Sequence, residues 1–251
     1  MNMINCKYFR NILALTLIFV SINGYANIAL PAYSDDDEII HHEYYTLKYN
    51  EDREQASWVA FALTEEMQTA EKVKRVNRFK SDPDVSTESA SPKDYRKSGY
   101  DRGHLCPSAA MSFSKEPMLE TFYMSNMSPQ KPGFNRGIWK KLETKVRKWA
   151  IENEKIYVVT GPIFYPDKEH KEIGSNGVDV PDAYYKIILD FREPDLKAIA
   201  FIFPNQKSKE PLSTFVVTVD HAEEVTGIDF FPGLPDYIED DLESQSNYGN
   251  W

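Results

Sequence analysis

Three apolar runs constrain the fold of this 251-residue chain more than any other feature. They are Ile156–Thr160, Tyr184–Leu189 and Ala198–Phe203, and each is rich in β-branched or aromatic residues and bounded by Gly, Pro or Asp. Runs of this length and composition are typical of strands buried on both faces of a sheet. They predict the central strands of one sheet.

The remaining segments set the fold class. Tyr44–Tyr49 and Ser57–Leu63 predict an opening hairpin, and Phe122–Met124 predicts a short strand. Residues 136–153 have the longest helical pattern. The strict alternation of strand and helix that builds a parallel sheet is absent. We therefore predict a mixed α/β (α+β) fold, with a largely antiparallel central sheet flanked by helices.

The first 26 residues have the pattern of a secretory signal peptide. Lys7 and Arg10 precede the apolar run Ile12–Ile22, and small residues follow up to Ala26. The run is shorter than the roughly 20 residues that a membrane span requires. A retained signal anchor is the alternative. We expect a secreted or periplasmic protein with no membrane anchor once the signal peptide is removed.

Charge and composition limit the classes of function. The net charge is −10, which excludes a protein that coats nucleic acid through bulk positive charge. A chain with 13% aromatic residues has enough apolar material for a real core. Acidic residues are concentrated in a predicted leader over residues 27–42 and a predicted tail over residues 237–251, which leaves a single domain over residues 43–236.

Two segments oppose this acidic balance. Residues 71–80 and 131–148 each contain several Lys and Arg residues against a single Glu. Such clusters on an anionic surface are able to concentrate a polyanion in one groove. A solvated helix face explains the same pattern, and charge alone does not decide between the two.

A short segment with acid, base and cation carries the strongest chemical signal. Asp101, Arg102, Gly103 and His104 follow one another, and in an extended segment Arg102 and His104 project to the same face. A neutral imidazole beside a fixed cation suits a general base acting on a water that attacks phosphate. Asp101 is better suited to orient its neighbours. A buried structural histidine next to a turn is the alternative.

A second set of residues lies on the predicted helix. Asn135, Trp139, Glu143 and Arg147 are four apart and form one stripe, while the neighbouring stripe that starts at Ile138 is apolar and faces the core. The polar stripe has two simpler explanations. Glu143 and Arg147 are spaced as an i,i+4 ion pair, and Asn135 is suited to cap the helix.

Together these motifs resemble the DNA/RNA non-specific endonuclease family of the ββα-metal superfamily, which includes secreted bacterial nucleases and endonuclease G-like proteins. Asn126–Gln130 belongs to the same pattern, and Val180–Lys186 and Thr226–Phe231 resemble later landmarks of the family. The resemblance extends over Tyr44–Asp236, with the motifs in the family's order and spacing.

The resemblance implies a role for each matching position. His104 matches the general base, and Asn135 matches the single protein ligand of a divalent cation, usually Mg²⁺, with Mn²⁺ or another divalent cation as alternatives. Glu143 matches the residue that holds metal-bound water. Arg102 and Arg147 match cations that stabilise the phosphate.

Supporting positions complete the comparison and include one departure. Asp101, Asn126 and Gln130 match residues around the family's site. Many relatives carry a further Arg at the position of Asn77, and a nearby cation, Arg78 or Arg75, is a candidate replacement.

The resemblance implies an enzyme that hydrolyses phosphodiester bonds of DNA and RNA with little sequence preference and leaves 5′-phosphates. Contacts to phosphate, rather than to base edges, account for the lack of preference. The alternative function is a catalytically silent nucleic-acid-binding protein on the same fold. The sequence does not indicate an oligomeric state.

Overall fold

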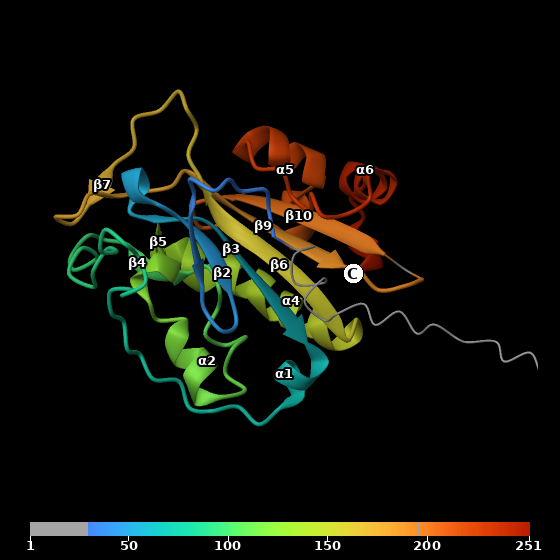
Figure 1. Ribbon diagram of the computed structural model, residues 1–251, viewed down its shortest axis with the longest axis horizontal. Coiled ribbons are helices and arrows are strands. Elements are labelled where there is room, and N and C mark those ends of the chain that lie inside the picture. Colours follow the sequence, from blue (N-terminus) through green and yellow to red (C-terminus); the bar gives the residue numbers. More distant parts are fainter. Residues whose placement is uncertain (1–29, 195) are drawn as a thin grey trace, which may run out of the picture.

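A seven-stranded antiparallel sheet organises the chain in a computed structural model that describes residues 30–194 and 196–251 (Figure 1). The strand order is β1-β2-β3-β6-β9-β10-β11. Its strands are β1 (Glu38–His41), β2 (Thr46–Asn50), β3 (Gln55–Thr64), β6 (Lys155–Ile163), β9 (Ala183–Asp190), β10 (Lys197–Pro204) and β11 (Val216–Val217). The predicted signal peptide over residues 1–26 lies outside the described residues.

The three apolar runs form neighbouring strands near the middle of this sheet, as predicted. In β9, Tyr184 and Ile188 belong to one hydrophobic cluster, whereas Tyr185, Ile187 and Leu189 belong to another. Successive side chains of a strand point to opposite faces, so the sheet has a core on each side. The mixed α/β fold class with a large antiparallel sheet is confirmed.

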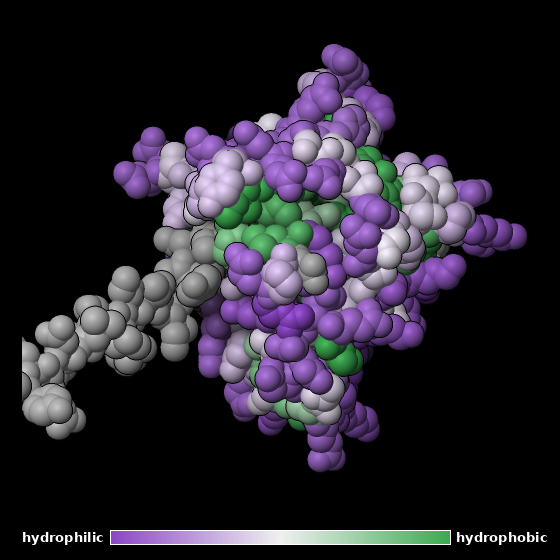
Figure 2. All heavy atoms as spheres, turned by 90° about the vertical axis from the view of Figure 1, so that its right-hand side faces the viewer, coloured by the Kyte–Doolittle hydropathy of each residue, from purple (hydrophilic) through white to green (hydrophobic). Residues whose placement is uncertain are grey.

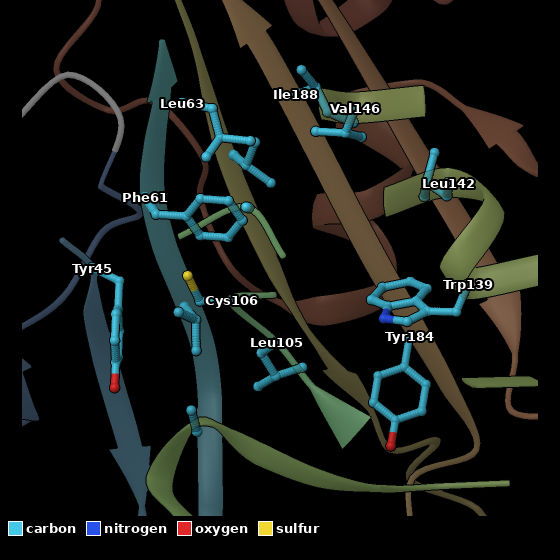
Figure 3. Packing of buried hydrophobic residues seen from close by; sticks show 14 of the residues in the cluster. Tyr45, Phe61, Leu63, Leu105, Cys106, Trp139, Leu142, Val146, Tyr184 and Ile188 are labelled. Atoms are coloured by element: carbon cyan, nitrogen blue, oxygen red, sulfur yellow. The ribbon is translucent and has the colours of Figure 1, made fainter. Parts of the chain in front are cut away.

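Helices cover both faces of the sheet. One face carries α4 (Lys140–Glu152), whose Leu142 and Val146 pack near Ile188 (Figure 3). The opposite face carries α5 (Val219–Thr226) and α6 (Asp236–Ser244) (Figure 1). The shorter helices are α1 (Glu65–Thr69), α2 (Lys115–Glu120) and α3 (Pro132–Phe134), and 3-10 turns span Glu51–Arg53, Met124–Asn126, Leu212–Phe215 and Tyr248–Asn250.

Two small strand pairs lie outside the main sheet. β4 (Asp101–His104) pairs with β5 (Met127–Gln130), and β7 (Glu172–Ile173) pairs with β8 (Val178–Asp179). The pair β4–β5 lies on the α4 side of the molecule (Figure 1) and is followed in the chain by α3 and α4. This succession of two strands and a helix contains nearly all of the predicted site residues.

The segments predicted as an acidic leader and an acidic tail both contribute to the described fold. Within residues 27–42, Glu38–His41 form the edge strand β1, and Ile40 is buried. Residues 237–251 include most of α6, in which Leu242 is buried, and the ring centroid of Trp251 lies 5.2 Å from that of Trp149. A few apolar side chains anchor each segment, although acidic residues dominate its composition.

The strand predicted at Phe122–Met124 is absent from the described fold. Met124 begins a 3-10 turn, and the preceding Tyr123 makes only an isolated bridge to Lys80. The backbone just before this segment instead holds a side chain in place, since Thr121 O accepts a hydrogen bond from the Asn126 side chain.

No helix among the described residues is long and apolar enough to span a membrane. The side of the molecule at the right of Figure 1 is largely hydrophilic, and the largest of its apolar areas lies above the centre of the view (Figure 2).

Candidate active site

The β4–β5 pair holds the first half of the site. In its antiparallel register Asp101 lies opposite Gln130 and His104 lies opposite Met127. Gly103 allows the close approach, because a Cβ atom there would lie 2.2 Å from Cδ of the Gln130 side chain. The fully buried Gln130 therefore packs directly behind the strand that carries Arg102 and His104.

An irregular helix holds the second half. A π-helical turn at Asn135–Trp139 joins α3 to α4, with a non-helical backbone at Gly137. Such turns are frequent at functional sites because they redirect side chains. Trp139 is fully buried against Tyr184 (Figure 3), and this anchors the turn.

The two halves enclose a cavity of about 390 Å³. It brings together five of the predicted site residues, namely Arg102, His104, Asn135, Glu143 and Arg147. Arg75, Arg136 and Lys140 also line it. A wall with five cationic side chains and one carboxylate is suited to a phosphodiester.

His104 is a buried imidazole with a free nitrogen. His104 is 8% exposed, and its Nε2 has no hydrogen-bond partner among the described residues. The ring packs edge-on against Phe122, with centroids 5.0 Å apart. Burial, and to a lesser degree the charge of Arg75, lowers the His104 pKa to about 3. The imidazole is therefore neutral near pH 7 and able to accept a proton.

Asn126 fixes the chain just after His104. Its Oδ1 accepts a hydrogen bond from Cys106 N at 2.8 Å, and its Nδ2 donates to Cys106 O at 3.0 Å and to Thr121 O at 2.9 Å. The side chain is completely buried. Asn126 thus supports the site from behind and does not line the cavity.

Asp101 orients Asn135. The Asn135 Nδ2 donates to Asp101 Oδ2 at 2.9 Å, and Arg136 Nε donates to the same oxygen at 2.8 Å. With its amino group engaged, Asn135 offers its amide oxygen for another contact. The helix-cap explanation for Asn135 does not hold, because its side-chain partner is this carboxylate on β4.

Glu143 is the acidic group of the cavity. Burial raises its pKa to about 7, against the lowering effect of Lys186 and Arg147. Lys186 is a buried cation on β9 whose Nζ lies 4.6 Å from the Trp139 ring centroid, and burial lowers its pKa to about 8. Arg147 donates hydrogen bonds of 3.2 Å to the backbone carbonyl of Glu143 and to Thr144 Oγ1.

The structure separates the two candidate replacements for the missing arginine. Both are exposed, but only Arg75 lines the cavity. Arg75 Nε donates to the Asn77 side chain at 2.8 Å, and its guanidinium carbon lies 5.2 Å from the Phe122 ring centroid. Asn77 therefore helps to place Arg75. The Arg102 guanidinium carbon lies 4.5 Å from the ring centroid of Phe79, which itself packs against Phe122.

Sequence reasoning did not single out Lys186 as part of this environment. The signal was a lysine inside an otherwise apolar strand, which is unusual unless the cation has a nearby acidic partner. Such a partner is not adjacent in the sequence and becomes evident only when β9 packs beneath α4.

The donor set fits a hydrated, oxygen-preferring divalent cation. The cavity offers one amide oxygen, from Asn135, and one carboxylate, from Glu143. Mg²⁺ commonly binds one or two protein oxygens and keeps several waters. The orientation of Asn135 by Asp101 is the kind of supporting contact that metal ligands have.

Comparisons with known proteins converge on nucleases. The sequence profile described as DNA/RNA non-specific endonuclease matches residues 26–237. Nuclease C1 of Cunninghamella echinulata var. echinulata is 38% identical over 216 residues, which cover 78% of this chain and 84% of that protein. The mitochondrial endonuclease G of Homo sapiens is 33% identical over 204 residues, which cover 76% of this chain and 69% of that protein.

A solved structure gives the same result for the fold. A chain in the crystal structure of the EndoG/EndoGI complex, which concerns EndoG inhibition, superposes with a TM-score of 0.77 at 33% sequence identity. The match covers 85% of this chain and 93% of that chain.

Proposed function

The chain belongs to the DNA/RNA non-specific endonuclease family, and we propose that it is an Mg²⁺-dependent endonuclease that hydrolyses phosphodiester bonds of both DNA and RNA. The observation that carries the proposal is the free Nε2 of the buried, neutral His104 in a cavity shared with Asn135, Glu143 and several arginines. Hydrolysis of nucleic acid is supported by relatives that are themselves nucleases.

His104 acts as the general base. Its Nε2 takes a proton from the water that attacks phosphorus, and the bond from phosphorus to the leaving 3′ oxygen then breaks, which leaves a 5′-phosphate. The low pKa keeps the imidazole unprotonated between turnovers. Asn126 holds the strand end so that the ring does not need to reorganise.

Arg75, Arg102 and Arg147 bind the phosphate oxygens on which negative charge builds up. The Arg102 guanidinium lies over the Phe79 ring, and Asn77 accepts a hydrogen bond from Arg75. Both guanidinium groups are therefore positioned before substrate arrives. Preorganised cations of this kind stabilise the transition state without reorganisation. None of these contacts addresses a base edge, in keeping with little sequence preference.

Asn135 Oδ1 would be the direct protein ligand of the divalent cation, and Glu143 would accept hydrogen bonds from its water shell. The cation would supply Lewis-acid stabilisation of the charge that develops on the phosphate and the leaving oxygen. Asp101 is a positioning residue, because it acts through Asn135.

The alternative is a catalytically silent nucleic-acid-binding protein. The cationic cavity would serve such a protein equally well, but a free, neutral base beside an oriented amide has no use in simple phosphate binding. Chelation distinguishes the two, because EDTA should abolish cleavage and leave binding of a noncleavable phosphorothioate strand largely intact.

The variant His104→Ala tests the proposed base. It should lower kcat by about 10²–10⁴-fold and leave strand binding within about threefold, because the side chain moves a proton and does not hold the phosphate. Near-normal cleavage by a folded His104→Ala protein would overturn the assignment. His221→Ala, which removes an exposed histidine on α5 outside the cavity, is the matched control.

We also propose export, to the periplasm or the exterior of the cell. The support is the charged, then apolar, then small-residue pattern of the first 26 residues. N-terminal sequencing of the protein recovered from its native host tests this, and a protein that starts before Lys7 would contradict it.

A further inference from the structure

A cluster of carboxylates lies between α5 and α6, on the face of the sheet opposite α4. A carboxylate oxygen from each of Asp220, Glu223 and Glu243 lies within 4.8 Å of the others. Asp220 and Glu223 come from α5, and Glu243 comes from the last turn of α6. Two parts of the chain about twenty residues apart thus bring their acids to one point.

Glu243 is the unusual member of this cluster. Its residue is only 6% exposed, and its Oε1 is buried with no hydrogen-bond partner among the described residues. None of the ion pairs found in the described part of the chain involves Asp220, Glu223 or Glu243. A buried carboxylate that points at other carboxylates without a cation is costly.

The surroundings increase this cost. Glu239 and Asp229 bring two further carboxylates close to Glu243. Glu223 Oε1 also accepts a hydrogen bond from Phe230 N at 2.6 Å, which fixes that side chain toward the cluster. A divalent cation would relieve the repulsion among all of these groups.

We propose that α5 and α6 bind a Ca²⁺ ion between the carboxylates of Asp220, Glu223 and Glu243. Ca²⁺ takes several protein oxygens, carboxylates among them, in a flexible geometry, which suits three carboxylates from two helices. Mg²⁺ usually keeps several waters and binds through only one or two carboxylates. Three carboxylates without a nitrogen or sulfur donor also favour Ca²⁺ over Zn²⁺.

The ion would have a structural role. It would hold the end of α6 against α5, and so keep Leu242 packed in the hydrophobic cluster on this face of the sheet. This site is distinct from the catalytic cavity, which lies on the α4 side of the sheet. The proposal does not depend on the proposed nuclease activity.

Isothermal titration of CaCl₂ into chelator-treated, desalted full chain tests the proposal. The Asn135→Ala background is used so that the active-site cavity does not contribute. This protein should bind one Ca²⁺, more tightly than Mg²⁺, and its Tm should rise by about 5 °C or more at 100-fold excess over Kd. Failure to bind Ca²⁺ in a natively folded sample would overturn the proposal.

Variants locate the ion. Glu243→Gln should weaken Ca²⁺ binding at least tenfold, and it should fold without Ca²⁺ because it removes a buried charge. Asp220→Asn, at an exposed position, should weaken binding in the same direction. Glu224→Gln changes a neighbouring exposed acid that is paired with His221 instead, so it should bind as the parent does. Equal binding by the Glu243 and Glu224 variants would refute the site.

Discussion

Replacing Gly103 with alanine should disrupt the strand pair that carries the proposed general base. The added Cβ would lie 2.2 Å from Cδ and Oε1 of Gln130 and 2.4 Å from its Cγ. Carbon atoms in contact normally lie about 3.5–4.0 Å apart, so one of the two groups must move by more than 1 Å. Gln130 is fully buried, so its side chain has no solvent-filled space to move into.

The expected cost follows from this overlap. Inserting a methyl group into a well-packed interior typically lowers the free energy of unfolding by about 1–3 kcal/mol. Because Gln130 is fully buried, we expect a loss of about 2 kcal/mol for Gly103→Ala. The Gln130→Ala variant alone should cost about 1 kcal/mol, since neither polar atom of its amide has a partner among the described residues. The double variant should also cost about 1 kcal/mol rather than 3, because the second change removes the atoms in conflict.

Urea unfolding of the four proteins, followed by far-ultraviolet circular dichroism, measures the cycle. A coupling free energy of about 2 kcal/mol in favour of the double variant is expected. Cleavage should fall with Gly103→Ala and recover in part in the double variant, since His104 adjoins the displaced residue. A loss of stability below about 0.5 kcal/mol for Gly103→Ala, or strictly additive changes, would refute the packing argument.

Three further outcomes follow from the cavity. Arg75→Ala should lower kcat/KM at least tenfold, whereas Arg78→Ala should keep kcat/KM within about threefold of wild type, because only Arg75 lines the cavity. Steady-state kinetics on one duplex substrate compares the two variants. Asp101→Ala removes the hydrogen-bond acceptor that orients the Asn135 amide, so the Mg²⁺ concentration for half-maximal cleavage should rise at least tenfold. An unchanged Mg²⁺ requirement would contradict the positioning role of Asp101. The proposed mechanism requires ionised Glu143, so activity should fall as the pH drops through the Glu143 pKa. Lys186→Met should move this acidic limb of the pH profile upward by about one pH unit, while Lys186→Arg leaves it in place. Coincident profiles for wild type and Lys186→Met would exclude an effect of the Lys186 charge on Glu143.

The central part of the fold was predictable because strong local signals matched the final environment. The runs that became β6, β9 and β10 are apolar on both faces, which only a two-sided core requires. Ile40 and Leu242 are different, because each lies in a segment in which acidic residues dominate. Composition averages over the segment, whereas packing depends on the individual side chain, so composition alone did not show that parts of the leader and tail pack onto the core.

The site shows the same division. The motif spacing placed Arg102, His104, Asn135, Glu143 and Arg147 together, and all five line one cavity. The choice between two nearby arginines was not predictable, because residues 71–79 form no regular element and have no fixed periodicity of side-chain direction.

Contacts between distant segments had no local signal either. The hydrogen bond from Asn135 to Asp101 spans 34 residues, and the electrostatic influence of Lys186 on Glu143 depends on how β9 packs beneath α4. Both became evident only from the tertiary arrangement.

Digestion of a plasmid and of total RNA tests the central claim most directly. Wild type would be compared with Asn135→Ala in Mg²⁺, in EDTA, and in EDTA followed by excess Mg²⁺. We predict that wild type degrades both substrates in Mg²⁺, that EDTA stops this and added Mg²⁺ restores it, and that Asn135→Ala is inactive throughout. Folded wild type that binds nucleic acid but cleaves neither substrate in Mg²⁺ or Mn²⁺ would contradict the account and favour the silent binding protein.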